Sequence, residues 1–69
     1  MKPLHYIITI QWSDRDQAYL ANVPELPGCH THGETYAEAL ENALEVIRLW
    51  LETARELGWP IPQPQIIAA

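Results

Sequence analysis

Three side chains that can bind metals or act as nucleophiles lie close together in mid-chain: Cys29, His30 and His32. The Cys29-x-x-His32 spacing is typical of metal ligands, and His5 offers a further imidazole. In a strand, however, successive residues point to opposite faces, so Cys29 would face away from both histidines. A tetrahedral site needs converging ligands, and no second pair is evident. We therefore expect no metal site and no cofactor, with a buried thiol and two solvent-facing imidazoles.

Carboxylates could in principle form a hydrolase site, and four are candidates: Asp14, Asp16, Glu25 and Glu34. Two-metal hydrolysis requires acidic residues fixed on rigid strands within about 4 Å of paired ions. The first candidate strand contains no carboxylate, and two of the four lie in a polar loop. Glu34 precedes a helix, where a negative charge favours the helix dipole. Neither a serine nor the cysteine has an evident base beside it, so we expect no catalytic residue.

Hydrophobic periodicity predicts the elements that position these residues. Alternating apolar side chains over residues 4–12 predict a first strand with one buried face. Polar residues 13–17 suit a hairpin loop, and residues 18–23 predict a second strand that ends at Pro24. Pro27-Gly28 fits the centre of a type II turn, with Gly28 at positive φ. A third strand is expected over residues 29–32.

A helix is predicted from Tyr36 to about Leu57. Thr35-x-x-Glu38 has capping-box spacing, in which the Thr35 hydroxyl accepts from the Glu38 amide and the Glu38 carboxylate reaches back to the Thr35 N–H. Gly58 suits the position after the helix, and Pro60 prevents its continuation. The expected apolar stripe comprises Leu40, Ala43, Leu44, Ile47, Trp50, Leu51 and Ala54.

These elements predict one α+β domain over residues 1–69, in the order β-β-β-α. One long helix would cover one face of a three-stranded antiparallel sheet. A Pro-rich tail occupies residues 60–69, and residues 65–69 could add a short fourth strand.

The charge balance favours a basic protein partner. Nine acidic and four basic residues give the 69-residue chain a formal charge of −5. Such a surface repels phosphate backbones, so we expect no direct nucleic-acid binding. No apolar run reaches the roughly 20 residues of a membrane span, and no signal-peptide core follows Met1. The expected location is the cytoplasm.

The small size of the domain favours self-association. A chain of this length buries only about 60% of its unfolded surface, and one cysteine excludes an internal disulfide. Apolar side chains at the far end of the helix extend beyond the sheet that would cover them. We expect Trp50 and Trp59 to form part of an oligomer or partner surface, in a dimer or tetramer.

The segment from Tyr19 to Ala43 resembles the signature of the HicB antitoxin family, approximately Y-x-x-x-x-P-D-L-P-G-C-x-T-x-G-D-T-x-E-E-A. Glu25 and Glu34 replace the usual Asp, and Ala37 replaces the usual Glu. For the matching residues we expect a structural role in backbone geometry. They are Pro24, Leu26, Pro27, Gly28, Cys29, Gly33, Thr35 and Ala39.

The resemblance implies a partial ribonuclease-H-like fold without nuclease activity. It also implies an antitoxin that binds and neutralises HicA, a small basic toxin that cleaves messenger RNA. Many relatives carry a C-terminal DNA-binding domain. Only five residues follow Pro64 here, so we expect that function to be absent or supplied by another protein.

Two alternatives stay open. The chain could be an orphan HicB-like oligomeric module that regulates or binds another molecule without a cognate toxin. It could also be a residual metal-dependent, ribonuclease-H-like hydrolase that uses His30, His32 and the acidic loops.

Overall fold

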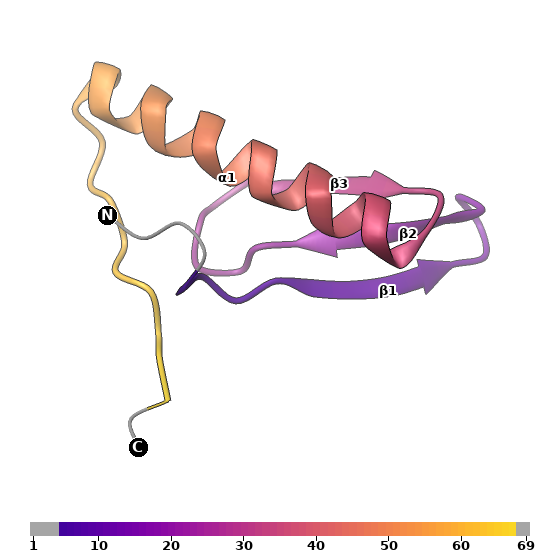
Figure 1. Ribbon diagram of the computed structural model, residues 1–69. Coiled ribbons are helices and arrows are strands. Elements are labelled where there is room, and N and C mark those ends of the chain that lie inside the picture. Colours follow the sequence, from indigo (N-terminus) through magenta and orange to yellow (C-terminus); the bar gives the residue numbers. More distant parts are fainter. Residues whose placement is uncertain (1–4, 68–69) are drawn as a thin grey trace.

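The computed structural model describes residues 5–67, which form two layers (Figure 1). Strands β1 (Thr9–Ser13), β2 (Ala18–Asn22) and β3 (His30–Gly33) form one antiparallel sheet in the order β1-β2-β3. Helix α1 (Tyr36–Leu57) lies across one face of this sheet. The predicted α+β fold is confirmed, whereas the closer likeness to ribonuclease H stays a prediction. No helix in the described part of the chain is long and apolar enough to cross a membrane.

Strands β1 and β2 are shorter than the sequence predicts, because pairing depends on the partner strand. β1 was expected to begin at Leu4, which lies outside the described residues, but it begins at Thr9, opposite Asn22. Strand β2 ends at Asn22, which pairs with Thr9 of β1 and His30 of β3. The next residue, Val23, belongs to the loop and donates its N–H to the Cys29 carbonyl at 3.0 Å. β3 has the predicted length but is shifted by one residue, to His30–Gly33, and the Cys29 N–H donates to the Leu26 carbonyl in the preceding turn.

The short fourth strand that residues 65–69 could have added does not form in residues 65–67, the part of it that the structure describes. Residues 59–67 contain no strand, and residues 68 and 69 lie outside the described part of the chain. Prolines at positions 60, 62 and 64 lack N–H groups, so the segment before residue 65 is also unsuited to a sheet ladder.

Helix α1 begins and ends at the residues that the sequence predicts. The Thr35 hydroxyl accepts a hydrogen bond from the Glu38 N–H at 3.0 Å. The Glu38 carboxylate differs from the prediction, because it accepts from the Glu34 N–H at 2.6 Å rather than from that of Thr35. At the other end Gly58 has φ of 73° and its N–H donates to the Ala54 carbonyl.

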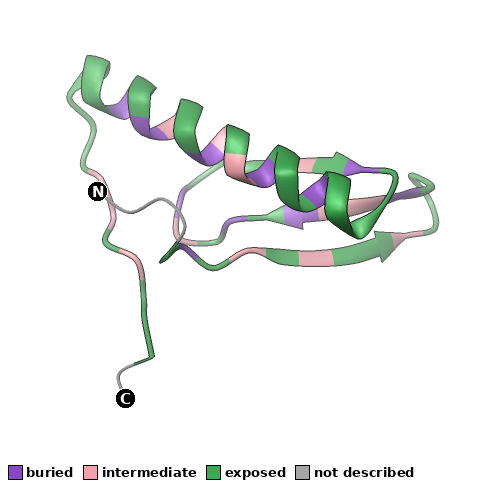
Figure 2. Ribbon diagram, viewed as in Figure 1, coloured by how far each residue is buried: buried purple, intermediate pink, exposed green. Residues whose placement is uncertain are grey.

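The predicted apolar stripe of α1 is confirmed at Ala43, Ile47, Leu51 and Ala54, and differs at its start, where Ala39 rather than Leu40 is buried. Figure 2 shows the buried residues of the helix turned toward the sheet. Leu40 is 42% exposed, whereas its neighbour Ala39 is fully buried. The reason is that small side chains are needed where the helix lies closest to β2 and β3. The buried residues of the helix are Ala39, Ala43, Ile47, Leu51 and Ala54.

The core has two parts along the helix. Near its start, Ala39 and Ala43 pack on Ala21 of β2. Further along, larger side chains fill the wider space between the helix and the loop after β2. This second cluster consists of Tyr6, Val23, Leu26, Cys29, Ile47 and Leu51.

Candidate functional site

The loop that joins β2 to β3 contains most of the signature residues, and its backbone is closed by two consecutive turns. The Leu26 N–H donates to the Val23 carbonyl, and the Cys29 N–H donates to the Leu26 carbonyl, each at 3.0 Å. Pro24 and Pro27 occupy the second position of these turns, where proline presets φ. Gly28 has φ of 74°, as a type II turn requires.

The apolar residues of this loop point into the core. Leu26 and Val23 are 1% and 2% exposed, and Cys29 is also buried. Desolvation raises the pKa of the Cys29 thiol, because burial disfavours the charged thiolate. The loop therefore forms part of the hydrophobic core at one end of the sheet. The Cys29 thiol is a poor nucleophile, because it is buried and stays protonated.

Gly33 and Ala39 mark the closest approach of the two layers. A Cβ on Gly33 would lie 2.4 Å from the Ala39 backbone nitrogen and 2.8 Å from the Ala39 Cα. Such contacts are too short for any side chain. The positions of these residues agree with the structural role that we predicted for the signature, and that role stays a prediction until variants are measured.

The side chains that suggested a metal site do not converge. Cys29 is buried, whereas His30, His32 and His5 are exposed. Within residues 5–67, no group of three or more His, Cys, Asp or Glu side chains could hold a metal ion. The structure thus offers no geometry for zinc or for a two-metal centre in its described part.

The candidate carboxylates are dispersed, and three of them are engaged in local or bridging hydrogen bonds. Asp14 accepts from the Trp12 indole N–H at 2.7 Å, and Asp16 accepts from the Ser13 hydroxyl at 2.9 Å. Both lie in the hairpin loop. Glu25 lies at the opposite end of β1 and binds backbone N–H groups, while Glu34 is exposed before the helix.

Sequence reasoning missed the role of Glu25, which connects three segments. One carboxylate oxygen accepts from the Ile7 N–H at 2.6 Å, and the other accepts from the Gln65 N–H at 2.5 Å. The residue thereby fixes both the entry to β1 and the segment after α1 to the loop. No local signal could have revealed this, since the partners are 18 and 40 residues away.

Trp50 and Trp59 lie together at the end of α1, and their ring centroids are 5.9 Å apart. The Trp50 indole N–H donates to the Pro27 carbonyl at 2.9 Å, and its ring packs against the core. Trp59 is 47% exposed. The two rings border a groove of about 450 Å³, here called the Trp groove, which is lined by Pro27, Trp50, Trp59, Pro60 and Pro62.

A second aromatic group lies at the other end of the sheet. Tyr19 contacts Trp12 edge to face, with ring centroids 5.0 Å apart, and Tyr36 at 4.2 Å. Trp12 and Tyr36 are both exposed on their outer sides. Because the three rings come from β1, β2 and the first residue of α1, they close this end of the fold.

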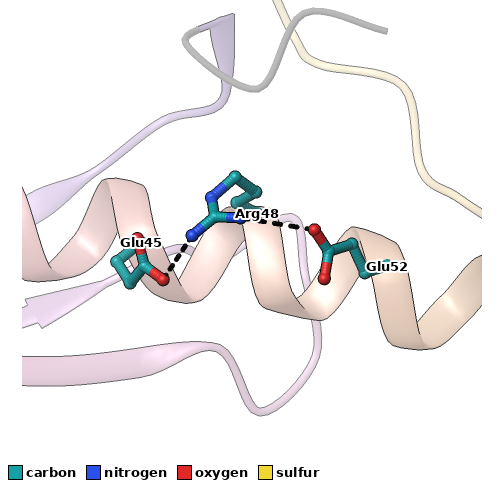
Figure 3. Close-up of polar contacts among 3 residues, drawn as sticks. All are labelled: Glu45, Arg48 and Glu52. Carbon is teal, nitrogen blue, oxygen red and sulfur yellow. Dashed lines mark hydrogen bonds and ion pairs between the residues drawn. The ribbon is translucent and has the colours of Figure 1, made fainter.

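The outer face of α1 is strongly acidic. Arg48 pairs with Glu45 at 2.5 Å and with Glu52 at 3.3 Å (Figure 3). The hydrogen bond from Arg48, and then its positive charge, lower the pKa of Glu45. Further exposed carboxylates on this helix are Glu38, Glu41 and Glu56. The face can therefore attract a basic partner.

Comparison with known proteins identifies the family of this chain. Residues 6–69 match the model of the HicB-like antitoxins of bacterial toxin–antitoxin systems. The chain belongs to the HicB-like antitoxin family. This confirms the resemblance found in the segment from Tyr19 to Ala43, and it extends the match over nearly the whole chain.

Relatives of this HicB-like chain occur in archaea and bacteria. UPF0150 protein Ta0767 of Thermoplasma acidophilum is 46% identical over 50 residues, which cover 72% of each chain. UPF0150 protein ssr1765 of Synechocystis is 33% identical over 63 residues, or 91% of this chain and 78% of the relative. A UPF0150 protein of Thermotoga maritima is 38% identical over 56 residues, 78% and 75% of the two chains. No solved structure matches the chain.

Proposed function

We propose that this HicB-like protein binds and neutralises a HicA-type toxin that cleaves messenger RNA, and that it does so without catalysis. The observation that carries the proposal is the family match over residues 6–69. A toxin that binds RNA needs a basic surface, and a chain of charge −5 is electrostatically suited to cover it. The same charge disfavours direct contact with nucleic acid.

The exposed face of α1 supports a binding role. Its glutamates lie on one 22-residue helix, which fixes the spacing of their backbone positions. Arg48 neutralises part of this charge through Glu45 and Glu52, but Glu41 and Glu56 lie outside that ion-pair group. We propose that these two carboxylates contact basic side chains of the toxin.

The test is calorimetry between the purified protein and the HicA-like protein encoded beside it, followed by an RNA-cleavage assay. We expect a stable complex and loss of cleavage in proportion to the antitoxin added. The double variant Glu41→Gln/Glu56→Gln should weaken binding, whereas Glu41→Asp/Glu56→Asp, which keeps both charges, should retain it. Lack of association with the wild-type protein would contradict the proposal.

The same experiment separates binding from catalysis. The antitoxin alone, incubated with RNA and Mg²⁺ or Mn²⁺, should leave the RNA intact. Turnover by the pure protein would instead favour the hydrolase alternative. A wild-type chain that is folded but binds no HicA-like protein would favour an orphan module.

A further inference from the structure

The Trp groove is an apolar hollow that the chain leaves open. Its five lining residues carry no charged group, and Trp59 exposes nearly half of its surface there. The rings of Trp50 and Trp59 form one wall and three prolines form the rest. Such a site suits a small aliphatic side chain, because rigid walls lose little entropy when they are covered.

The segment after the groove presents aliphatic side chains that have no pocket of their own. Ile66 is 69% exposed and Ile67 is 100% exposed. Pro62 and Pro64 fix φ on either side of Gln63, so this stretch is stiff and extended. We call residues 63–67 the tail.

Two hydrogen bonds hold the tail and the residue before it against their own chain. The Tyr6 hydroxyl donates to the Pro62 carbonyl, and Glu25 holds the Gln65 N–H, so the base of the tail is fixed at both points. Figure 1 shows this segment leaving the end of α1 and running away from the helix, past the sheet. The two isoleucines follow Gln65 in the chain, so they extend beyond the second of these hydrogen bonds, and both are exposed.

We propose that a second copy of this chain fills the Trp groove with Ile66 and Ile67, and that the exchange is reciprocal about a two-fold axis. Each copy has one groove and one tail, so the tail of each copy would bind in the groove of the other. Two such contacts related by a two-fold axis make a closed dimer. Beyond the anchor at Gln65, the two extended residues span about 7 Å, so the groove of the second copy must lie close to this anchor.

Charge selects a second copy as the occupant. Two chains of −5 repel each other over most of their surfaces, and the helical face is the worst place for them to meet. The groove residues and residues 63–67 contain no ionisable side chain. Glu25 is the charged group nearest the tail, and one of its carboxylate oxygens accepts from the Gln65 N–H. Association through the groove and the isoleucines therefore opposes fewer like charges than association through the helical face.

Sedimentation equilibrium of the full chain, with no toxin present, tests the proposal. We expect a concentration-dependent dimer. Ile66→Ser/Ile67→Ser on the tail, and Trp59→Ala in the groove, should each raise the dimer dissociation constant roughly 100-fold or more. Leu40→Ser is the matched control, since it removes an exposed aliphatic side chain at the opposite end of α1 and should leave the dimer intact.

Mixing the two weakened variants distinguishes reciprocal exchange from other contacts. The tail variant keeps an intact groove and the groove variant keeps an intact tail, so together they restore one of the two contacts. We expect a heterodimer tighter than either variant alone. Circular dichroism should show that both variants stay folded.

Three results would overturn the proposal. They are a wild-type chain that stays monomeric, a tail variant that dimerises as tightly as the wild type, and a dimer abolished by Leu40→Ser. The third would move the interface to the other end of α1. Since the toxin is absent, the outcome is independent of the antitoxin proposal.

Discussion

At the scale of single residues, Gly33 has the strictest requirement. Atoms of the Ala39 backbone lie 2.4 and 2.8 Å from the place of a Cβ, and backbone cannot rotate away. Gly33→Ala must therefore push α1 off the sheet. We expect it to lower the free energy of unfolding by about 2–3 kcal/mol, measured by urea denaturation.

Gly28→Ala is the matched control for this prediction. Gly28 has φ of +74°, but a Cβ at this position would have no atom within 4 Å. Alanine there would strain the backbone without colliding with a neighbouring atom. Its expected cost is about 1 kcal/mol. Equal stability of Gly33→Ala and the wild type would show that the layers are not in such close contact.

Glu25 provides a second prediction at this scale. Glu25→Ala removes the acceptors of two backbone N–H groups, those of Ile7 and Gln65. Hydrogen exchange at both amides should become faster, because each then opens without breaking a charge-assisted bond. The Glu38 amide, which Thr35 caps, serves as an internal control and should be unchanged. Unaltered exchange at Ile7 and Gln65 would contradict the bridging role.

Cys29 predicts a dependence of stability on alkaline pH. Burial raises the pKa of its thiol, so the unfolded chain loses this proton first, near its ordinary pKa of about 8.5. The contribution of the neutral thiol to stability is complete below that pH and declines as the pH rises toward the folded-state pKa. Urea denaturation between pH 7 and 10 should show a smaller loss for Cys29→Ala than for the wild type.

Tyr6 also contributes to the dependence of stability on alkaline pH, in the wild type and in Cys29→Ala alike. Burial, and then the negative charge of Glu25, raise the pKa of its phenol, so Tyr6 also disfavours folding at still higher pH. This contribution is present in both proteins and cancels in the comparison. Identical pH dependence with and without the thiol would contradict the prediction for Cys29.

At the scale of elements, the start of α1 depends on Thr35. Its hydroxyl satisfies the Glu38 N–H, which has no partner within the helix. Thr35→Ala should cost about 1 kcal/mol of stability, and Thr35→Ser, which keeps the hydroxyl, should cost much less. Thermal unfolding followed by circular dichroism measures both. If the two variants had the same melting temperature, the hydrogen bond from the Glu38 N–H to the Thr35 hydroxyl would not contribute to stability.

The bounds of α1 could be predicted because its signals are local. Thr35 and Gly58 each act within about one turn of the helix, so the sequence beside them contains the required information. The direction of the Glu38 side chain was predicted less well. The N–H groups of Glu34 and Thr35 are adjacent, and the sequence does not distinguish which one the carboxylate reaches.

Strand bounds could not be predicted as closely, because a strand ends where its partner ends. Among the described residues before Thr9, residues 5–8 continue the alternating pattern but have no partner in the ladder. The turns of the signature loop were predictable from Pro27 and Gly28, since their φ angles are intrinsic. The contacts of Glu25 were not, because they depend on segments that meet only after folding.

At the scale of the whole molecule, charge is unevenly distributed. The outer face of α1 carries most of the helix carboxylates, whereas the Trp groove and residues 63–67 are uncharged. A basic toxin and a second copy of the chain would therefore prefer different surfaces. This arrangement allows an oligomer to keep its acidic helices accessible to the toxin.

The same distribution predicts how toxin capture responds to salt. Charges on an exposed helix act over about 10 Å at 0.1 M salt and over only about 3 Å at 1 M. We expect the association rate with a HicA-like toxin to fall by roughly tenfold or more across this range, while the dissociation rate changes less. Stopped-flow mixing at several salt concentrations measures both rates.

Variants in the acidic face of α1 and in the Trp groove test which of the two surfaces causes the salt dependence. Glu41→Gln/Glu56→Gln removes two exposed charges from α1 and should reduce the slope of the association rate against salt. Trp59→Ala changes no charge and should leave the slope unaltered, even if it changes the oligomeric state. A rate that is independent of salt, or a slope altered only by Trp59→Ala, would mean that the toxin meets an uncharged surface rather than the acidic helix.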